Sequence, residues 1–226
     1  MSLANKEKFA KRDDYGNFDS NLFFLEQTGL LANDKKILEI GCGTCRLLNY
    51  FLQKSYDIRG VDVNREYLAQ GRKLYGSLPV EQVESERLPF ADNSFDLVFG
   101  FDVFEHIDDT AGHLKEVSRV LKDNGHYLLQ TPNKWTNVIF ESIRWKSFTS
   151  WRNDHCALHS FFEVQKRFAE HGFEVEFYDI PIVTDFFRDK VRSYMGSAGL
   201  LFLKIFNIDK FPYCLRTNFY LSAAKK

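Results

Sequence analysis

The sequence has few cysteines, no long apolar run and almost no net charge, and each absence excludes a class of protein. Four cysteines in 226 residues are too few for a disulfide scaffold, so a reducing cytoplasm is the expected setting. No stretch approaches the roughly 18 apolar residues that a membrane-spanning helix needs, and residues 1–8 lack the apolar stretch of a secretory signal. A net charge of −1 without a dense basic tract argues against nucleic acid as a partner.

What the sequence does contain is enough apolar material for one full core. It is 44% hydrophobic and 16% aromatic, with neither an internal repeat nor a low-complexity linker, so residues 1–226 are expected to form a single domain. Segments of helical and strand periodicity alternate along it, which predicts an α/β fold with a doubly wound sheet and helices on both faces. The expected helices cover 22–31, 46–52, the segment capped by Asn64, 114–121 and the segment between Ser160 and Gly172, and the expected strands cover 36–40, 58–61, 95–101, 127–129, 173–177 and 217–223.

The most informative segment is the glycine turn that follows the first expected strand. Gly41 and Gly43 separate that strand from a helix, and Asp62 closes the next strand. Glycines in such a turn let a ligand lie against the backbone, and an acid at the end of the next strand can accept hydrogen bonds from a ribose. The pattern predicts a site for a cofactor that contains a nucleoside.

Several motifs in order resemble those of the class I S-adenosylmethionine-dependent methyltransferases over residues 35–180. They are the segment 39–43 (EIGCG), Asp62, the segment 84–90 with its Leu-Pro-Phe end, and the segments 94–98 and 101–106. The resemblance implies a seven-stranded, mostly parallel sheet with an antiparallel last strand, and S-adenosyl-L-methionine as the cofactor. The cofactor-binding residues that it implies are Glu39, Gly41, Cys42, Gly43, Asp62, Val63, Glu84, Ser85, Phe101, Asp102 and Val103. Cys45 departs from the family pattern, because it stands where a third glycine is common.

Three other interpretations of the glycine turn and the cysteines are weaker. A nicotinamide dinucleotide site, and with it an NAD-dependent oxidoreductase, would need a third glycine in the turn and would leave Glu39 and Glu84 without a use. Cys42 and Cys45 have the spacing of a redox dithiol, but the glycine turn already accounts for their surroundings. No metal site is expected, because Cys156 and Cys214 are isolated and form no second close pair.

The candidates for a general base are three histidines, of which the first follows the expected strand 95–101. His106 follows that strand, where the acceptor pocket of the family usually opens, and an imidazole can take a hydroxyl proton near neutral pH. His155 and His159 are weaker candidates in a loop that could border the same pocket. Each also has an ordinary explanation as a capping, packing or surface residue, and many methyltransferases use no base.

The expected domain organisation is an N-terminal helical cap (1–34), a cofactor-binding core (35–131) and two substrate-side loops or lids (132–160 and 184–213). Because the two loop segments are rich in aromatic residues, they could cover an aromatic, isoprenoid or sugar-linked small molecule, pack on a second copy, or rest on a membrane surface. The resemblance favours methyl transfer to a hydroxyl oxygen of a small molecule. N-methylation and a catalytically silent cofactor-binding or scaffold protein remain open at this stage, and the sequence does not indicate an oligomeric state.

Overall fold

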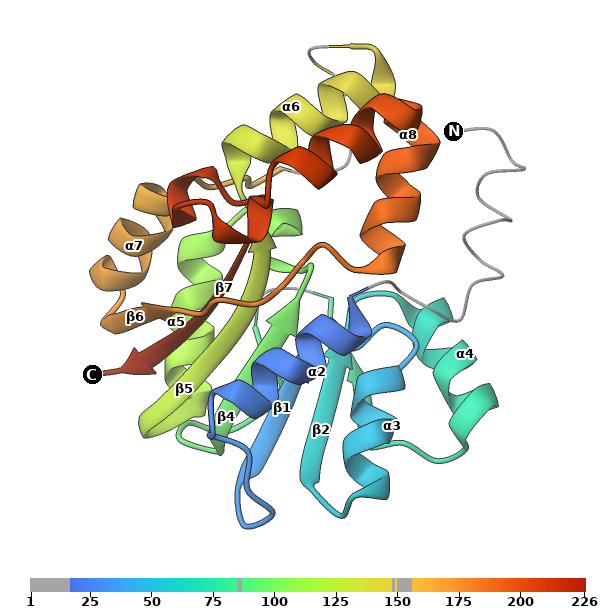
Figure 1. The fold of residues 1–226 in the computed structure, drawn as a ribbon. Helices are drawn as coiled ribbons and strands as arrows, with labels where there is room; N and C mark the ends of the chain where they lie inside the picture. The colour runs from blue at the N-terminus through green and yellow to red at the C-terminus, as the bar shows by residue number, and fades with distance from the viewer. Residues whose placement is uncertain (1–16, 85–86, 148, 150–155) are drawn as a thin grey trace.

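The computed structural model describes residues 17–84, 87–147, 149 and 156–226. Within this part of the chain seven strands form one sheet in the order β3-β2-β1-β4-β5-β7-β6, in which β7 runs antiparallel to both of its neighbours (Figure 1). The strands are β1 (Lys36–Ile40), β2 (Asp57–Asp62), β3 (Val80–Gln82), β4 (Phe95–Phe101), β5 (Leu121–Pro132), β6 (Phe173–Phe177) and β7 (Asn218–Lys225). The predicted fold class and antiparallel last strand are confirmed.

Five of the described helices that flank and cap this sheet correspond to the five predicted ones. They are α2 (Phe18–Gln27), α3 (Arg46–Gln53), α4 (Arg65–Tyr75), η1 (Phe104–His106), α5 (Thr110–Val120), α6 (Lys134–Trp145), α7 (Phe161–Glu170), α8 (Asp185–Ile205), η3 (Ile208–Lys210) and η4 (Tyr213–Leu215). Local chemistry sets their starts: Asn64 Oδ1 accepts from the amides of Glu66 and Tyr67, and Ser160 forms a complete capping box with Glu163.

Three details of the predicted elements were wrong. The first helix begins at Phe18 and ends at Gln27, four residues earlier at each end than the expected 22–31. The strand expected over 127–129 is longer, because β5 starts with Leu121 directly after α5 ends at Val120. Leu121 already pairs with Phe95, the register of the pairing then shifts, and Asn124 has a left-handed φ of 61° inside the strand. On α4 an apolar face of Tyr67, Leu68, Gly71, Leu74 and Tyr75 is expected from the spacing of these residues, but only Leu68 and Gly71 are buried.

Apolar side chains form a core on each face of the sheet. One core contains Phe24 of α2, Phe51 of α3 and Phe99 of β4. The other core contains Phe104, Tyr127 and Phe168 among others. The second core encloses a polar pair, because His113 Nε2 lies 3.0 Å from Tyr127 Oη and both side chains are buried. Burial lowers the pKa of His113 to about 4, so His113 is neutral in the folded protein at neutral pH.

The two segments expected to be substrate-side loops or lids contain the helices α6 and α8. α6 and α8 form a cap at the carboxyl end of the parallel strands (Figure 1). The second half of α8 changes direction at Gly196, whose φ of 59° and ψ of −149° interrupt the helix. Phe140 of α6 meets Tyr194 of α8 edge to face, with ring centroids 6.0 Å apart. None of the described helices has the length and hydropathy to cross a bilayer.

Acid should destabilise the fold through His113. Its folded pKa lies below the usual value near 6.5, so the unfolded chain binds more protons between those two values and stability is lost as pH falls through that window. In His113→Gln, whose amide can still bond Tyr127, this loss is absent. Urea unfolding should therefore show the wild-type advantage over the variant shrinking by about 2 kcal/mol from pH 7 to pH 5. An advantage that does not change with pH would contradict a buried neutral His113.

Candidate cofactor site

The turn between β1 and α3 has an unusual backbone that hydrogen bonds to β2 hold in place. Gly41, Gly43 and Cys45 all have positive φ, at 73°, 51° and 65°. The amides of Gly41 and Cys42 both donate to the carbonyl of Val61, at 2.8 and 3.1 Å. The left-handed conformation favours glycine at the first two positions. The turn is thus a preformed loop, fixed to the end of the neighbouring strand.

Asp62 fastens the same loop from its other side. Its Oδ2 accepts from the Gly43 amide at 2.7 Å, and its Oδ1 accepts from the Asn64 amide at 2.7 Å. Its side chain lies at the carboxyl end of β2 and is 7% exposed. Because a carboxylate offers about four lone-pair sites, Asp62 can accept further hydrogen bonds from a ligand. The residue predicted to bind a ribose therefore also shapes the loop.

Gly41 is needed for packing as well as for backbone conformation. A Cβ at this position would overlap Cγ2 of Val103, which comes from the segment after β4. A Cβ on Gly43 would meet no atom of the described residues within 4 Å. The missing side chain of Gly41 thus lets the segments that follow β1 and β4 touch, and Gly43 leaves open space above the loop.

Cys45, the departure from the family pattern, is accommodated inside the protein. It is completely buried, and its Sγ lies 3.9 Å from that of Cys42. A Cβ on Gly71 of α4 would meet Cys45 Sγ at 2.9 Å and the Thr44 carbonyl oxygen at 2.8 Å, so glycine at position 71 provides the room. The side chain points into helix packing and away from the open face of the loop, and its left-handed backbone matches the conformation that glycine would adopt there.

Glu39 places a buried carboxyl group beneath the loop. Its side chain is 6% exposed, and among the described residues Oε2 has no hydrogen-bond partner. Burial, with added repulsion from Cys45 and Asp62, raises the pKa of Glu39 well above its usual value. A buried acceptor without a partner is costly unless a ligand satisfies it, which makes Glu39 a candidate to receive a donor from the cofactor.

The end of β4 forms the next wall of the site. Phe101 stacks on Phe99, with ring centroids 5.4 Å apart, and Asp102 follows with a left-handed φ of 54°. The Asp102 amide is held by Gln130, which offers its backbone oxygen at 3.2 Å and its Oε1 at 3.0 Å. Asn17, at the start of α2, donates to Asp102 Oδ2 at 3.1 Å. A strained residue fixed on three sides is typical of a functional site.

Sequence reasoning missed Gln130, Asn17 and Glu105. Glu105 is 1% exposed, and its Oε2 accepts from Thr131 Oγ1 at 3.1 Å. Burial, assisted by the charge of Asp102, raises the pKa of Glu105 to about 8. A glutamate inside an apolar turn was the available signal for Glu105. Asn17 and Gln130 gave none, since their partner lies far from them in the chain.

Two further predicted cofactor residues, Val63 and Glu84, lie just beyond the ends of β2 and β3. Val63 directly follows Asp62 and is 68% exposed, and its carbonyl accepts from Gln82 Nε2 at 3.3 Å. Glu84 is exposed just beyond β3. Ser85 lies outside the described residues, so its predicted role stays a prediction.

The three histidines differ in accessibility. His106 is exposed at the end of η1. His159 is 7% exposed and lies against Phe104, with ring centroids 5.3 Å apart, and burial lowers its pKa below the usual value. His155 lies outside the described residues. Accessibility to an acceptor therefore favours His106 over His159 as a proton acceptor.

Comparison with known proteins places this loop in a large family. Residues 38–129 match the family model described as a methyltransferase domain. A probable S-adenosylmethionine-dependent methyltransferase of Mycobacterium tuberculosis is 32% identical over 102 residues, which are 45% of this chain and 37% of that protein. A ubiquinone biosynthesis O-methyltransferase of Acinetobacter baumannii is 29% identical over 115 residues, 48% of each chain. The chain thus spans less than half the length of these curated relatives.

Solved structures agree at the level of the fold. A phosphoethanolamine N-methyltransferase of Haemonchus contortus, solved with S-adenosyl-L-methionine, superposes with a TM-score of 0.64 at 21% identity, over 92% of this chain and 52% of the other.

The packing of Gly41 against Val103 can be tested by unfolding in urea. Gly43→Ala should cost about 1–2 kcal/mol, since it suffers only the strain of a left-handed backbone. Gly41→Ala should cost about 1–3 kcal/mol more, because it also overpacks against Val103. The double variant Gly41→Ala/Val103→Ala should recover that excess. Equal costs for the two alanine variants, or no recovery, would contradict this packing.

Proposed function

Because the chain belongs to the class I S-adenosylmethionine-dependent methyltransferases, we propose that it transfers a methyl group from S-adenosyl-L-methionine to a small molecule, at a hydroxyl oxygen. The observation that carries the proposal is the left-handed loop 41–45, fixed by Asp62 beside the unpartnered carboxyl of Glu39. A hydroxyl is preferred as the acceptor because a relative that matches about half of the chain is a ubiquinone O-methyltransferase.

The residues present fit this cofactor. Glu39 Oε2 is an acceptor suited to the ammonium of the methionine portion, and the open face above Gly43 gives that portion room. Asp62, with lone pairs left over, is assigned to the ribose hydroxyls, and Val63 and Glu84 to the adenine, together with Ser85. When bound, the cofactor supplies a methyl group on a sulfonium, which is already a good leaving group. The protein then has to align the acceptor and exclude water.

The segment after β4 is assigned to the acceptor side. Phe101 and Val103 provide apolar walls, and Asp102 is held with its carboxylate exposed. His106, exposed just beyond them, would take the hydroxyl proton through its imidazole. An N-methyltransferase is the second candidate, favoured by the fold of the phosphoethanolamine enzyme, and would have less need of His106. A catalytically silent cofactor-binding protein would keep the loop and Asp62 without transferring a methyl group.

Incubation with methyl-labelled S-adenosylmethionine and cell extract tests the proposal. We expect label in the small-molecule or lipid-extractable fraction, in a product whose methyl group is stable to conditions that cleave esters. Label in precipitated protein or nucleic acid would contradict a small-molecule acceptor. Cofactor binding without transfer to any fraction would favour the silent alternative.

The role of His106 can be measured in the same assay. His106→Ala should lower turnover about 10²-fold or more, the usual contribution of a general base, with little change in cofactor affinity. His171→Ala is the matched control, since His171 lies at the end of α7 and bonds the carbonyl of Arg167. Unchanged turnover in His106→Ala would remove His106 from the mechanism and would strengthen the case for a nitrogen acceptor.

A further inference from the structure

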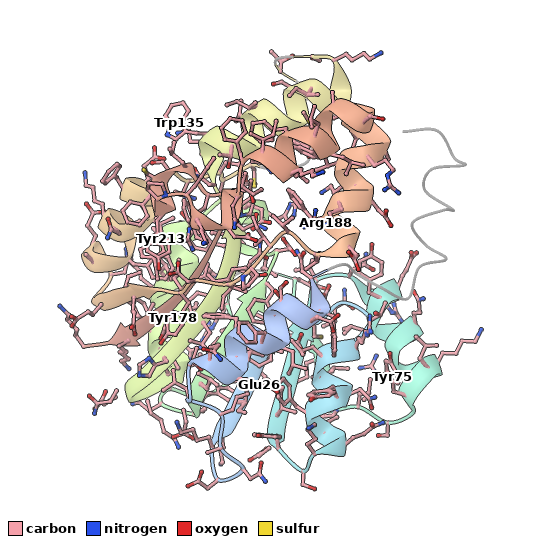
Figure 2. All side chains as sticks on the ribbon, in the orientation of Figure 1. Glu26, Tyr75, Trp135, Tyr178, Arg188 and Tyr213 are labelled. Carbon is pink, nitrogen blue, oxygen red and sulfur yellow. The ribbon has the colours of Figure 1, made fainter. Side chains whose placement is uncertain are left out.

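α6 has its polar and apolar faces reversed relative to a helix that packs on a protein core. Trp135, Ile139 and Ile143, at intervals of four residues, form an exposed stripe in which the side chains are 61%, 63% and 45% accessible. Figure 2 shows Trp135 projecting outward from this helix. Soluble proteins bury such side chains when they can, so the stripe needs a partner outside the described chain.

The inner side of the same helix is polar. Glu141 is 3% exposed, and neither Asn137 Oδ1 nor Ser142 Oγ, both buried, has a hydrogen-bond partner within the described residues. An ordinary amphipathic helix would turn these groups to water and the apolar stripe inward. The reversal indicates that the outer face of α6 meets an apolar medium.

α8 carries a second exposed apolar stripe after its kink. Leu201, Phe202 and Ile205 are 57%, 45% and 64% accessible, and Phe206 directly after the helix is 47% accessible. The side chain of Leu203, on the opposite side of the helix, is buried and belongs to the core. Both helices belong to the cap at the carboxyl end of the sheet (Figure 1), so the two stripes lie on one part of the molecule.

The charge of this part of the molecule differs from that of the rest. Residues 134–147 and 185–216 together hold nine Lys or Arg and four Asp or Glu, a net charge of +5, although the whole chain has −1. The remaining residues therefore carry −6. Two of the nine cations, Lys134 and Arg216, form ion pairs with Glu163 and Asp179 outside these segments, so the positive charge left for a partner comes from the other basic residues. Lys204 and Lys210 are exposed beside the α8 stripe. Apolar side chains flanked by basic ones are the features that bind a helix to the interface of an anionic bilayer.

We propose that the α6–α8 cap docks on the surface of an anionic membrane, with the two apolar stripes in the interfacial region and the basic side chains near the lipid headgroups. Docking in this way places the carboxyl end of the sheet next to the bilayer. An acceptor held in the membrane would then reach the cofactor site through the cap, which specifies the acceptor of the proposed function as a membrane-held, lipid-like molecule. The docking itself does not rest on the proposed function, because it needs neither cofactor nor acceptor.

Vesicle flotation with the full chain tests the docking. Wild type should float with vesicles of phosphatidylcholine and phosphatidylglycerol, bind less as NaCl rises, and stay unbound with phosphatidylcholine alone. Leu201→Glu should reduce the floated fraction by about tenfold or more, since it removes buried apolar area and adds repulsion. The matched control is Leu74→Glu on α4, because Leu74 is 54% accessible and the charge change is the same. The control should float like wild type.

Three results would overturn the proposal. The first is a wild type that fails to float with anionic vesicles at low salt, and the second is a loss of flotation in Leu74→Glu as large as in Leu201→Glu. The third is a dimer, detected by light scattering, that Leu201→Glu dissociates, which would assign the stripes to contact between two copies. Flotation needs no methyl transfer, so the two experiments are independent. A failure to float does not change the expected result of the labelled-methyl assay, and an absence of methyl transfer does not change the expected flotation.

Discussion

The site depends on one constraint, the left-handed backbone of the loop between β1 and α3. That backbone is held by the Val61 carbonyl and by the Asp62 carboxylate, both at the end of β2. Gly41 also contacts Val103 because it has no side chain, and this contact connects the ends of β1 and β4. Without these contacts the residues after three strands would be independent loops. With them, the segments that follow β1, β2 and β4 form one connected structure.

The fold and the cofactor loop were predictable because their signals are local in sequence. Gly41 and Gly43 follow an apolar strand, and Asp62 follows the next one, so periodicity and turn chemistry are enough to place all three. Their positions at neighbouring strand ends follow from parallel pairing. Cys45 departs from the family pattern, and the structure accommodates its side chain in helix packing beside Gly71, a residue of the next helix.

The rest could not be predicted, because it depends on contacts between residues far apart in the chain. Asn17 and Gln130 hold Asp102 across 85 and 28 residues, and neither lies in a recognisable motif. The segments 132–160 and 184–213 were expected as substrate-side loops or lids, and the helix α6 was not predicted from the sequence. Its apolar stripe suggests burial in a core, and only the structure shows that Trp135 and Ile139 face outward.

Calorimetric titration of the purified chain with S-adenosylhomocysteine, and separately with NAD⁺, tests the central claim most directly. The loop described above predicts one binding site for S-adenosylhomocysteine, a loss of affinity of about tenfold or more in Asp62→Ala, and no heat with NAD⁺. Binding of NAD⁺ without binding of S-adenosylhomocysteine would contradict the assignment of this loop.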